Sequence, residues 1–301
     1  MITGFLFISK LLKDQGCTDW FKLFESRIFR IFPLYMFALF IISLVVFFSS
    51  DFKLLVEPLE LLREYLKWFL FYGWDINGFP QTNKIIAQVD WTLKYEWLFY
   101  LSLPLISLVI KSGKTITYIL IISCLILFIF PFKLIGIKSI YFVLFGVGGV
   151  CSYLRKSKLP EYNFFTSRLA SFISLIALVC SLFIQDSFSL QHVVVMAIFF
   201  FIVSMGNDMF GLFRKRASIL LGEISYSIYL LHGIILYFCF TIFDYFPLKY
   251  VGMDEYLLFM IPLCILVIFF STLTYLIIEL PFINYGRRYF FSKKIRKWIG
   301  T

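Results

Sequence analysis

Long apolar runs recur along almost the whole chain, and they constrain its fold more than any other feature of the sequence. An α-helix needs about 20 mostly apolar residues to cross roughly 30 Å of hydrocarbon. Eight runs approach or exceed this length: 31–49, 96–110, 115–132, 139–154, 169–185, 190–206, 218–243 and 256–280. With 61% hydrophobic and 15% charged residues, the 301-residue chain carries more apolar surface than a soluble core needs. The sequence therefore predicts an all-α polytopic membrane bundle of about eight transmembrane helices, forming a single domain over residues 1–301.

Two shorter apolar pieces do not reach this length. The piece from Trp68 to Trp74 predicts an interfacial or re-entrant element, because Trp and Tyr favour the headgroup level of a membrane. The piece before Lys10 lacks the basic region and cleavage site of a signal peptide. It is either the second half of a span whose first half is missing or a short interfacial stub.

The positions of the basic residues predict an orientation in the membrane. The net charge is +10, and with segment 10–30 placed in the cytoplasm, 20 of the 28 Lys and Arg residues lie on that side. This asymmetry follows the positive-inside rule for an even number of spans, so both ends of the chain are expected in the cytoplasm. The excess charge is thus explained by topology, and no nucleic-acid partner is expected. The six cysteines include no CxxC pair, so neither a disulfide framework nor a metal site is predicted.

Ionisable residues in or beside the spans are candidate functional groups, because they are costly in hydrocarbon. Arg27 and Arg30 share one helix face at the cytoplasmic mouth of a span. They could clamp phosphate groups, or they could be ordinary positive-inside anchors. Glu96 lies in the first turns of a span, soon after Trp91. It could act as a base, orient a hydroxyl, or be a structural partner of Lys or Arg.

Two further segments carry polar groups late in the chain. A polar stripe at helical spacing predicts a helix face turned to the bundle interior, and it comprises Gly222, Ser225, Tyr226, Tyr229, His232 and Gly233. His232 is then near mid-bilayer, as a functional group or as a core histidine satisfied by Ser or Tyr. In Ile278-Glu279-Leu280-Pro281, the proline is expected to end the last helix and leave Glu279 at the interface.

Taken together and in this order, these segments resemble the acyltransferase-3 family of integral membrane acyltransferases. The resemblance spreads over nearly the whole chain. The matching segments are Thr3-Gly4-Phe5, Arg27/Arg30/Pro33, Trp91-Thr92-Leu93 with Glu96 and Phe99-Tyr100, Gly222 to His232, and Glu279 with Pro281. Each motif alone is weak, but five in register are specific.

The resemblance implies transfer of an acyl group, commonly acetyl, from cytoplasmic acyl-CoA. The acceptor it implies is a hydroxyl of a cell-envelope polysaccharide or lipid-linked sugar, at or beyond the outer face of a bacterial inner membrane. Acyl-CoA is then a co-substrate, a saccharide or glycolipid is the partner, and no cofactor is expected.

The resemblance also suggests roles for individual residues. Arg27 and Arg30 would hold the acyl-CoA phosphates, and Glu96 would orient the acceptor or the base. Trp91 and Tyr226 would contact the substrate. His232 could replace the base, although a structural role is favoured for it.

The chain departs from the family's pattern at its beginning. The family shows ten spans, and the first carries an Arg and a His that nothing in this chain matches. Thr3-Gly4-Phe5 corresponds to the middle of the family's second span. We therefore expect an N-terminally incomplete family member that is weakly active or inactive as it stands.

Two other classes share the bulk composition. A transporter or flippase of lipid-linked saccharides is typically built from internal repeats with Gly- and Pro-broken helices in matched positions. No repeat of fixed period is visible in this sequence. A non-catalytic membrane relative of the acyltransferases is the third reading.

Overall fold

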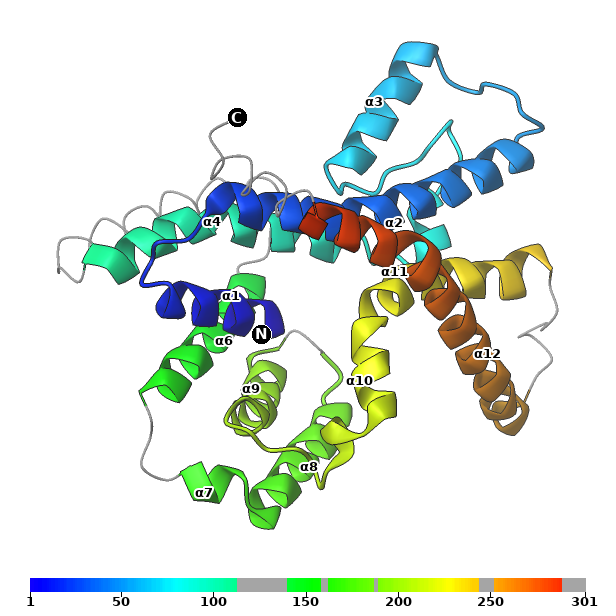
Figure 1. The fold of residues 1–301 in the computed structure, drawn as a ribbon. Helices are drawn as coiled ribbons and strands as arrows, with labels where there is room; N and C mark the ends of the chain where they lie inside the picture. Colours follow the sequence, from blue (N-terminus) through cyan, green and yellow to red (C-terminus); the bar gives the residue numbers. More distant parts are fainter. Residues whose placement is uncertain (113–139, 158–161, 187–188, 244–251, 289–301) are drawn as a thin grey trace. The chain divides into compact units, whose positions relative to one another are not determined.

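The computed structural model describes residues 1–112, 140–157, 162–186, 189–243 and 252–288 (Figure 1). Regular structure in these ranges is helical apart from one isolated bridge between Ile76 and Phe79, which confirms the all-α prediction. Two compact units are present. The first unit combines Met1–Asp19 with Tyr95–Leu220, and the second combines Trp20–Lys94 with Leu221–Thr301. Each unit is therefore assembled from segments that lie far apart in the sequence.

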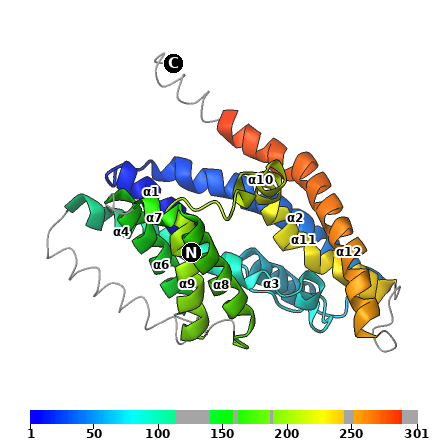
Figure 2. The same ribbon diagram turned by 90° about the horizontal axis from the view of Figure 1, so that it is seen from below.

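The first unit is built on two helix pairs, α1 with α6 and α8 with α9 (Figures 1 and 2). Its helices are α1 (Ile2–Lys13), most of α4 (Trp91–Ser112), α6 (Ile140–Lys156), α7 (Tyr162–Phe165), α8 (Arg168–Leu182), α9 (Leu190–Ser204) and η2 (Leu212–Arg214). Ser167 and Ser189 cap the starts of α8 and α9 by accepting backbone N–H groups three residues on.

Glycines allow α1 and α6 to pack backbone against backbone. A Cβ atom at Gly4 would collide with the carbonyl oxygen of Phe145, and one at Gly148 would collide with that of Met1. Farther along both helices, Ser9 Oγ lies 2.8 Å from Ser152 Oγ. The two helices thus run parallel, and their basic C-terminal ends lie together.

The second unit is built around α2 and α11. Its elements are α2 (Trp20–Ser49), α3 (Pro58–Phe69), η1 (Thr82–Ile86), α11 (Ser225–Tyr237), η3 (Phe238–Ile242), α12 (Met253–Thr274) and η4 (Tyr275–Glu279). The short α10 (Arg216–Glu223) precedes α11. Gly233 of α11 meets the backbone of η1, where an added Cβ would lie 2.6 Å from the Ala87 nitrogen.

Buried polar contacts order the long connection between α2 and α4. Asn77 is fully buried, and its side chain accepts from the Leu55 N–H and donates to the Lys53 carbonyl, both at 2.8 Å. Trp68 is fully buried as well and donates to the carbonyl of Trp74, whose own side chain is exposed. The piece from Trp68 to Trp74 is therefore the end of α3 and a following turn, and its relation to a membrane stays a prediction.

The expected spans match the helices in part. By length and composition, three helices of the described residues could cross a membrane: Trp20–Ser49, Ser225–Ile242 and Leu257–Arg288. The expected spans 96–110 and 139–154 fall in α4 and α6, and 169–185 and 190–206 correspond to α8 and α9 of 15 residues each. The span 115–132 lies outside the described residues. The count of about eight therefore stays a prediction.

The predicted span 218–243 is wrong as one continuous helix. Ile224, at φ −86° and ψ 4°, leaves the helical region and separates α10 from α11. Gly222, two residues earlier, lowers the helix propensity of this stretch.

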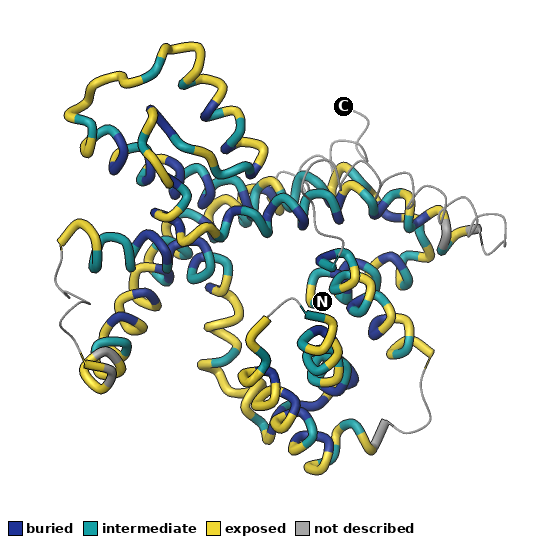
Figure 3. Tube along the Cα trace, turned by 180° about the vertical axis from the view of Figure 1, so that it is seen from behind, coloured by how far each residue is buried: buried dark blue, intermediate teal, exposed yellow. Residues whose placement is uncertain are grey.

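The predicted helix end at Pro281 is also wrong. The helix continues to Arg288, and a wide π-helical turn, η4, ends two residues before the proline. Such turns alter the backbone hydrogen-bond pattern within a helix, which is where a proline can be accommodated. Much of the surface of this long helix is exposed and apolar (Figure 3), including Ile261, Ile265 and Phe269. Such a face suits contact with lipid.

Candidate functional site

A buried carboxylate lies where three helices of the second unit meet. Glu279 is fully buried in η4, and its Oε1 lies 4.0 Å from Arg30 Nε on α2. Its Oε2 accepts a 2.9 Å hydrogen bond from Ser227 Oγ on α11. The helix continues past Glu279, and the carboxylate is buried among the helices of this unit. The expected place of Glu279 at a membrane interface stays a prediction. The carboxylate joins α2, α11 and the last long helix at one point.

The two arginines of α2 differ in their surroundings. Arg27 is half-buried, and Arg30, with 40% of its side chain exposed, is the partner of Glu279. A guanidinium has five N–H donors, so the contact with Glu279 leaves Arg30 able to donate to another anion. Arg30 thus has a structural partner that the sequence did not indicate, and the contact does not remove its capacity for phosphate. The phosphate and anchoring interpretations of the arginine pair both stay predictions.

Tyr226 lies beside this junction and binds α11 to α2. Its hydroxyl donates to the carbonyl of Ile31 at 2.9 Å, in the turn before Pro33. The predicted substrate contact of Tyr226 is not tested by this arrangement. The hydrogen bond shows a packing role. The predicted interior stripe is correct only in part, because Gly222 and Ser225 at its start are exposed, whereas the later members are half-buried or buried.

His232 is held by its own helix. Its Nδ1 lies 2.8 Å from the Tyr229 carbonyl and 3.2 Å from that of Ile228. Because carbonyl oxygens only accept, Nδ1 must carry the proton in these contacts, and Nε2 of the neutral ring then has a lone pair. The Tyr229 hydroxyl donates to Val89 O at 2.8 Å and contacts the Thr92 hydroxyl at 2.6 Å. Half-buried Trp91, the neighbour of Thr92, begins α4 at this point.

Glu96 lies in the first unit and contacts a different motif. Its Oε2 accepts a 3.0 Å hydrogen bond from the Tyr100 hydroxyl, and its Oε1 lies 3.5 Å from the Thr3 hydroxyl of α1. The structure therefore brings Glu96 together with the Thr3-Gly4-Phe5 segment. The arginines, His232 and Trp91 belong to the second unit.

Sequence reasoning did not single out Asp90, although it is buried. Its Oδ2 accepts the Gly73 N–H at 2.8 Å, and glycine at that position lets the carboxylate approach closely. Burial raises the pKa of Asp90, and the Gly73 hydrogen bond and the charge of Lys94 oppose that rise. The signal available in the sequence was an aspartate directly before the first residue of a helix.

Among the described residues, no three His, Cys, Asp or Glu side chains gather in a way that could hold a metal ion. In comparisons with known proteins, the family model described as an acyltransferase domain matches residues 1–276. No curated protein gives a significant match, and no solved structure does. The matched range includes Glu96, both arginines of α2 and His232, and it ends three residues before Glu279.

Proposed function

Because the chain belongs to the acyltransferase-3 family of membrane acyltransferases, we propose that it transfers an acetyl group from cytoplasmic acetyl-CoA. The acceptor is a hydroxyl of a cell-envelope polysaccharide or of a lipid-linked sugar. The reaction breaks the thioester C–S bond and forms an ester C–O bond. The proton of the hydroxyl leaves to a base, and the CoA thiolate takes up a proton. The family match favours this reading over a transporter of lipid-linked saccharides.

The observation that carries the donor side of the proposal is the contact between Arg30 and buried Glu279. Buried Glu279 restrains the Arg30 side chain, so less conformational entropy is lost when that guanidinium binds phosphate. Arg27, one helical turn away, extends the same positive face. Guanidinium groups bind phosphate in a bidentate way, and the pyrophosphate and 3′-phosphate of CoA supply several such anions.

On the acceptor side, we propose that Glu96 orients the hydroxyl. Its carboxylate already accepts the Tyr100 hydroxyl at 3.0 Å, so it can accept a substrate hydroxyl in the same way. His232 is the second candidate for the base, because the contacts at Nδ1 leave the lone pair on Nε2. Trp91 and Tyr226 are proposed to line the path of the substrate.

The test uses the chain in proteoliposomes with acetyl-labelled acetyl-CoA and hexyl β-D-glucoside as a hydroxyl-bearing acceptor. We expect weak but detectable ester-bound label on the glucoside, in line with the weak activity expected from the sequence. Arg27→Gln should raise the KM for acetyl-CoA at least about tenfold, since it removes a charge-assisted contact to phosphate. Arg288→Gln, which removes an exposed arginine of the same unit, is the matched control and should change KM less than about twofold.

Two further variants separate the acceptor roles. Glu96→Gln should lower kcat with little change in the KM for acetyl-CoA. If His232 is the base, His232→Gln should lower kcat by more than Glu96→Gln does. Equal effects of Arg27→Gln and Arg288→Gln would refute the donor assignment. A chain that neither transfers the label nor binds CoA in equilibrium dialysis would overturn the proposed function.

A further inference from the structure

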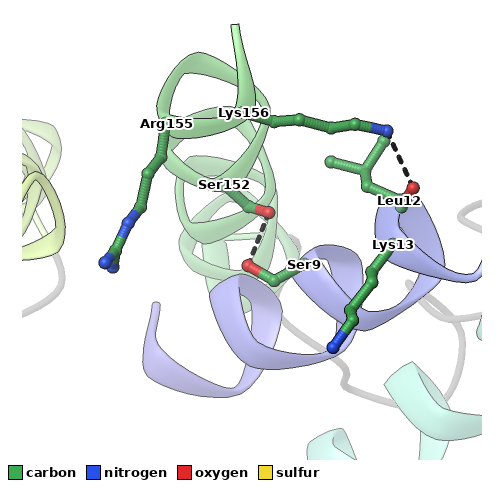
Figure 4. Close-up of a pocket in the computed structure, with 6 residues that line it drawn as sticks. All are labelled: Ser9, Leu12, Lys13, Ser152, Arg155 and Lys156. Carbon is green, nitrogen blue, oxygen red and sulfur yellow. Dashed lines mark hydrogen bonds between the residues drawn. The ribbon is translucent and has the colours of Figure 1, made fainter. Parts of the chain in front are cut away.

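The C-terminal ends of α1 and α6 enclose a pocket whose lining carries three cations and no acidic side chain (Figure 4). Its volume is about 310 Å³, and it is lined by Ser9, Leu12, Lys13, Ser152, Arg155 and Lys156. None of these residues belongs to the arginine pair of α2 or to the Glu96 contacts. The pocket lies within the first unit, and both helices that form it are fully described there.

Neutral groups hold two of the cations in place. Lys156 Nζ donates to the Leu12 carbonyl at 2.8 Å, and an Arg155 guanidinium N–H donates to the Ser204 carbonyl at 3.0 Å. These bonds orient the side chains without neutralising their charge. The hydrogen-bonded hydroxyls of Ser9 and Ser152 lie between Arg155 on one side and the two lysines on the other (Figure 4).

The positive charge of the residues that line the pocket exceeds the partial negative charge of the two helix C-termini. The C-terminus of an α-helix carries about half a negative charge, so the two ends together offset roughly one of the three cations. Lys156 already caps the last turn of α1 through the Leu12 carbonyl. Asp14, the next residue after Lys13, is instead in contact with the Thr18 hydroxyl at 3.4 Å and does not line the pocket. The lining residues therefore carry more formal positive charge than the helix ends offset, beside the one hydroxyl proton that the Ser9–Ser152 hydrogen bond leaves over.

We propose that this pocket binds a phosphate group. Arg and Lys donate charge-assisted hydrogen bonds to phosphate oxygens, and serine hydroxyls add neutral donors of the right length. Two sources share this chemistry: the headgroup of an anionic phospholipid and a phosphate of CoA. Basic pockets between helices on the cytoplasmic side of membranes suit the first source. The site goes beyond the proposed transferase, because it uses residues that the donor and acceptor assignments do not.

The experiment measures how ligands shift the unfolding temperature of the full chain in a neutral detergent. A ligand that binds the folded state raises this temperature with concentration, which yields a Kd. The probes are short-chain phosphatidylglycerol, CoA, and short-chain phosphatidylcholine as the comparison without net charge. The test variant is Lys13→Gln with Arg155→Gln, which leaves the capping Lys156 in place.

A matched control removes the same two charges from outside the pocket. Lys215→Gln with Arg216→Gln takes one lysine and one arginine from exposed positions of the same unit. We expect the pocket variant to weaken binding of phosphatidylglycerol or CoA about 30-fold, and the control to change it less than about threefold. If the double variant does not fold, Lys13→Gln alone is measured. Lys13 donates no hydrogen bond to any described residue, and its loss should cost about fivefold.

Each outcome decides the proposal. A selective loss of phosphatidylglycerol binding assigns the site to lipid, a selective loss of CoA binding assigns it to the donor, and loss of both supports a general phosphate site. Two results overturn it: no stabilisation of the unaltered chain by either probe, or an equal loss in the control variant. An absence of stabilisation by CoA also bears on the proposed donor, and the label-transfer assay with Arg27→Gln then tests the transferase separately. An equal loss in the control variant overturns only the pocket and leaves the proposed transferase standing.

Discussion

The α1–α6 pair and the junction of α2, α11 and the last long helix join helices by opposite means. In the α1–α6 pair, Gly4 and Gly148 have no side chains, so the backbones of the two helices contact each other directly. In the second, a fully buried carboxylate collects a guanidinium and a hydroxyl from neighbouring helices. The first contact forms because glycines have no side chain there, and the second forms because charged and polar side chains meet.

The difference follows from the surroundings expected for these helices. In lipid, apolar side chains gain little by leaving the hydrocarbon for one another, so helices associate through close backbone packing or through hydrogen bonds. The glycine contact tolerates no added atom, whereas the carboxylate contact tolerates no lost partner. Two kinds of substitution therefore distinguish these contacts. One adds an atom to the glycine contact, and the other removes a partner from the carboxylate contact.

The largest effect is expected at the carboxylate. Arg30→Gln removes the cation beside Glu279 and leaves a fully buried carboxylate with the Ser227 hydrogen bond. Removing one member of a buried ion pair costs about 3–5 kcal/mol. We expect about 3 kcal/mol, since the 40% exposure of Arg30 lets solvent screen part of the interaction. Denaturant unfolding in detergent micelles measures the change.

The double variant Arg30→Gln with Glu279→Gln tests whether the uncompensated charge of Glu279 causes this loss of stability. Gln at 279 keeps an acceptor for Ser227 and removes the buried charge, so about half of the lost stability should return. Arg288→Gln, at an exposed position, should stay within about 0.5 kcal/mol of the unaltered chain. If the double variant is no more stable than Arg30→Gln alone, the buried charge of Glu279 is not the cause of the lost stability.

The glycine contact should give the next largest effect. Gly148→Ala places a Cβ atom against the Met1 carbonyl and 2.7 Å from the Phe5 nitrogen, so α1 must shift. Overpacking of this kind costs about 2 kcal/mol. Gly146→Ala, on the same helix, meets nothing within 4 Å and should gain up to about 1 kcal/mol from helix propensity. Similar unfolding curves for the two variants would show that α1 and α6 do not pack as described.

The two regions were accessible to sequence reasoning to different degrees. The sequence indicated the family and the all-α fold, because ionisable residues are rare in apolar runs and their spacing forms recognisable motifs. Gly146 and Gly148, by contrast, look alike in the sequence. What distinguishes them is the neighbouring helix α1, which begins more than a hundred residues earlier.

Glu279 shows why part of the candidate site could not be predicted. A proline two residues later is an ordinary sign of a helix end, which places the carboxylate at an interface. The structure contradicts the helix end, because the helix runs on through Pro281, and Glu279 is buried among neighbouring helices. Its partner Arg30 is distant in sequence, so no local pattern could pair the two.

The contact of Gly73 with Asp90 combines close packing at a glycine with a buried carboxylate, because the missing side chain of Gly73 leaves room for the Asp90 carboxylate. Burial raises the pKa of Asp90 above its ordinary 3.8, so the folded chain binds this proton more tightly than the unfolded chain does. The free energy of unfolding should therefore fall as the pH rises from the ordinary pKa of Asp90 through its raised pKa in the folded chain. Asp90→Asn keeps an acceptor for the Gly73 N–H and should flatten this slope. Unfolding temperatures across the acidic range measure it, and an unchanged slope would exclude Asp90 as its source.

The smallest expected effect is at Ser9 and Ser152, where the close α1–α6 contact also carries a hydrogen bond of 2.8 Å. Ser9→Ala removes one hydroxyl while α1 keeps its glycine packing, so the cost should be about 0.6 kcal/mol, typical of hydrogen bonds between membrane helices. Because each hydroxyl satisfies the other, Ser152→Ala should cost the same, and the double variant should cost no more than either single one. Additive losses in this cycle would show that the two serines act independently, and that glycine packing alone sets the register of the pair.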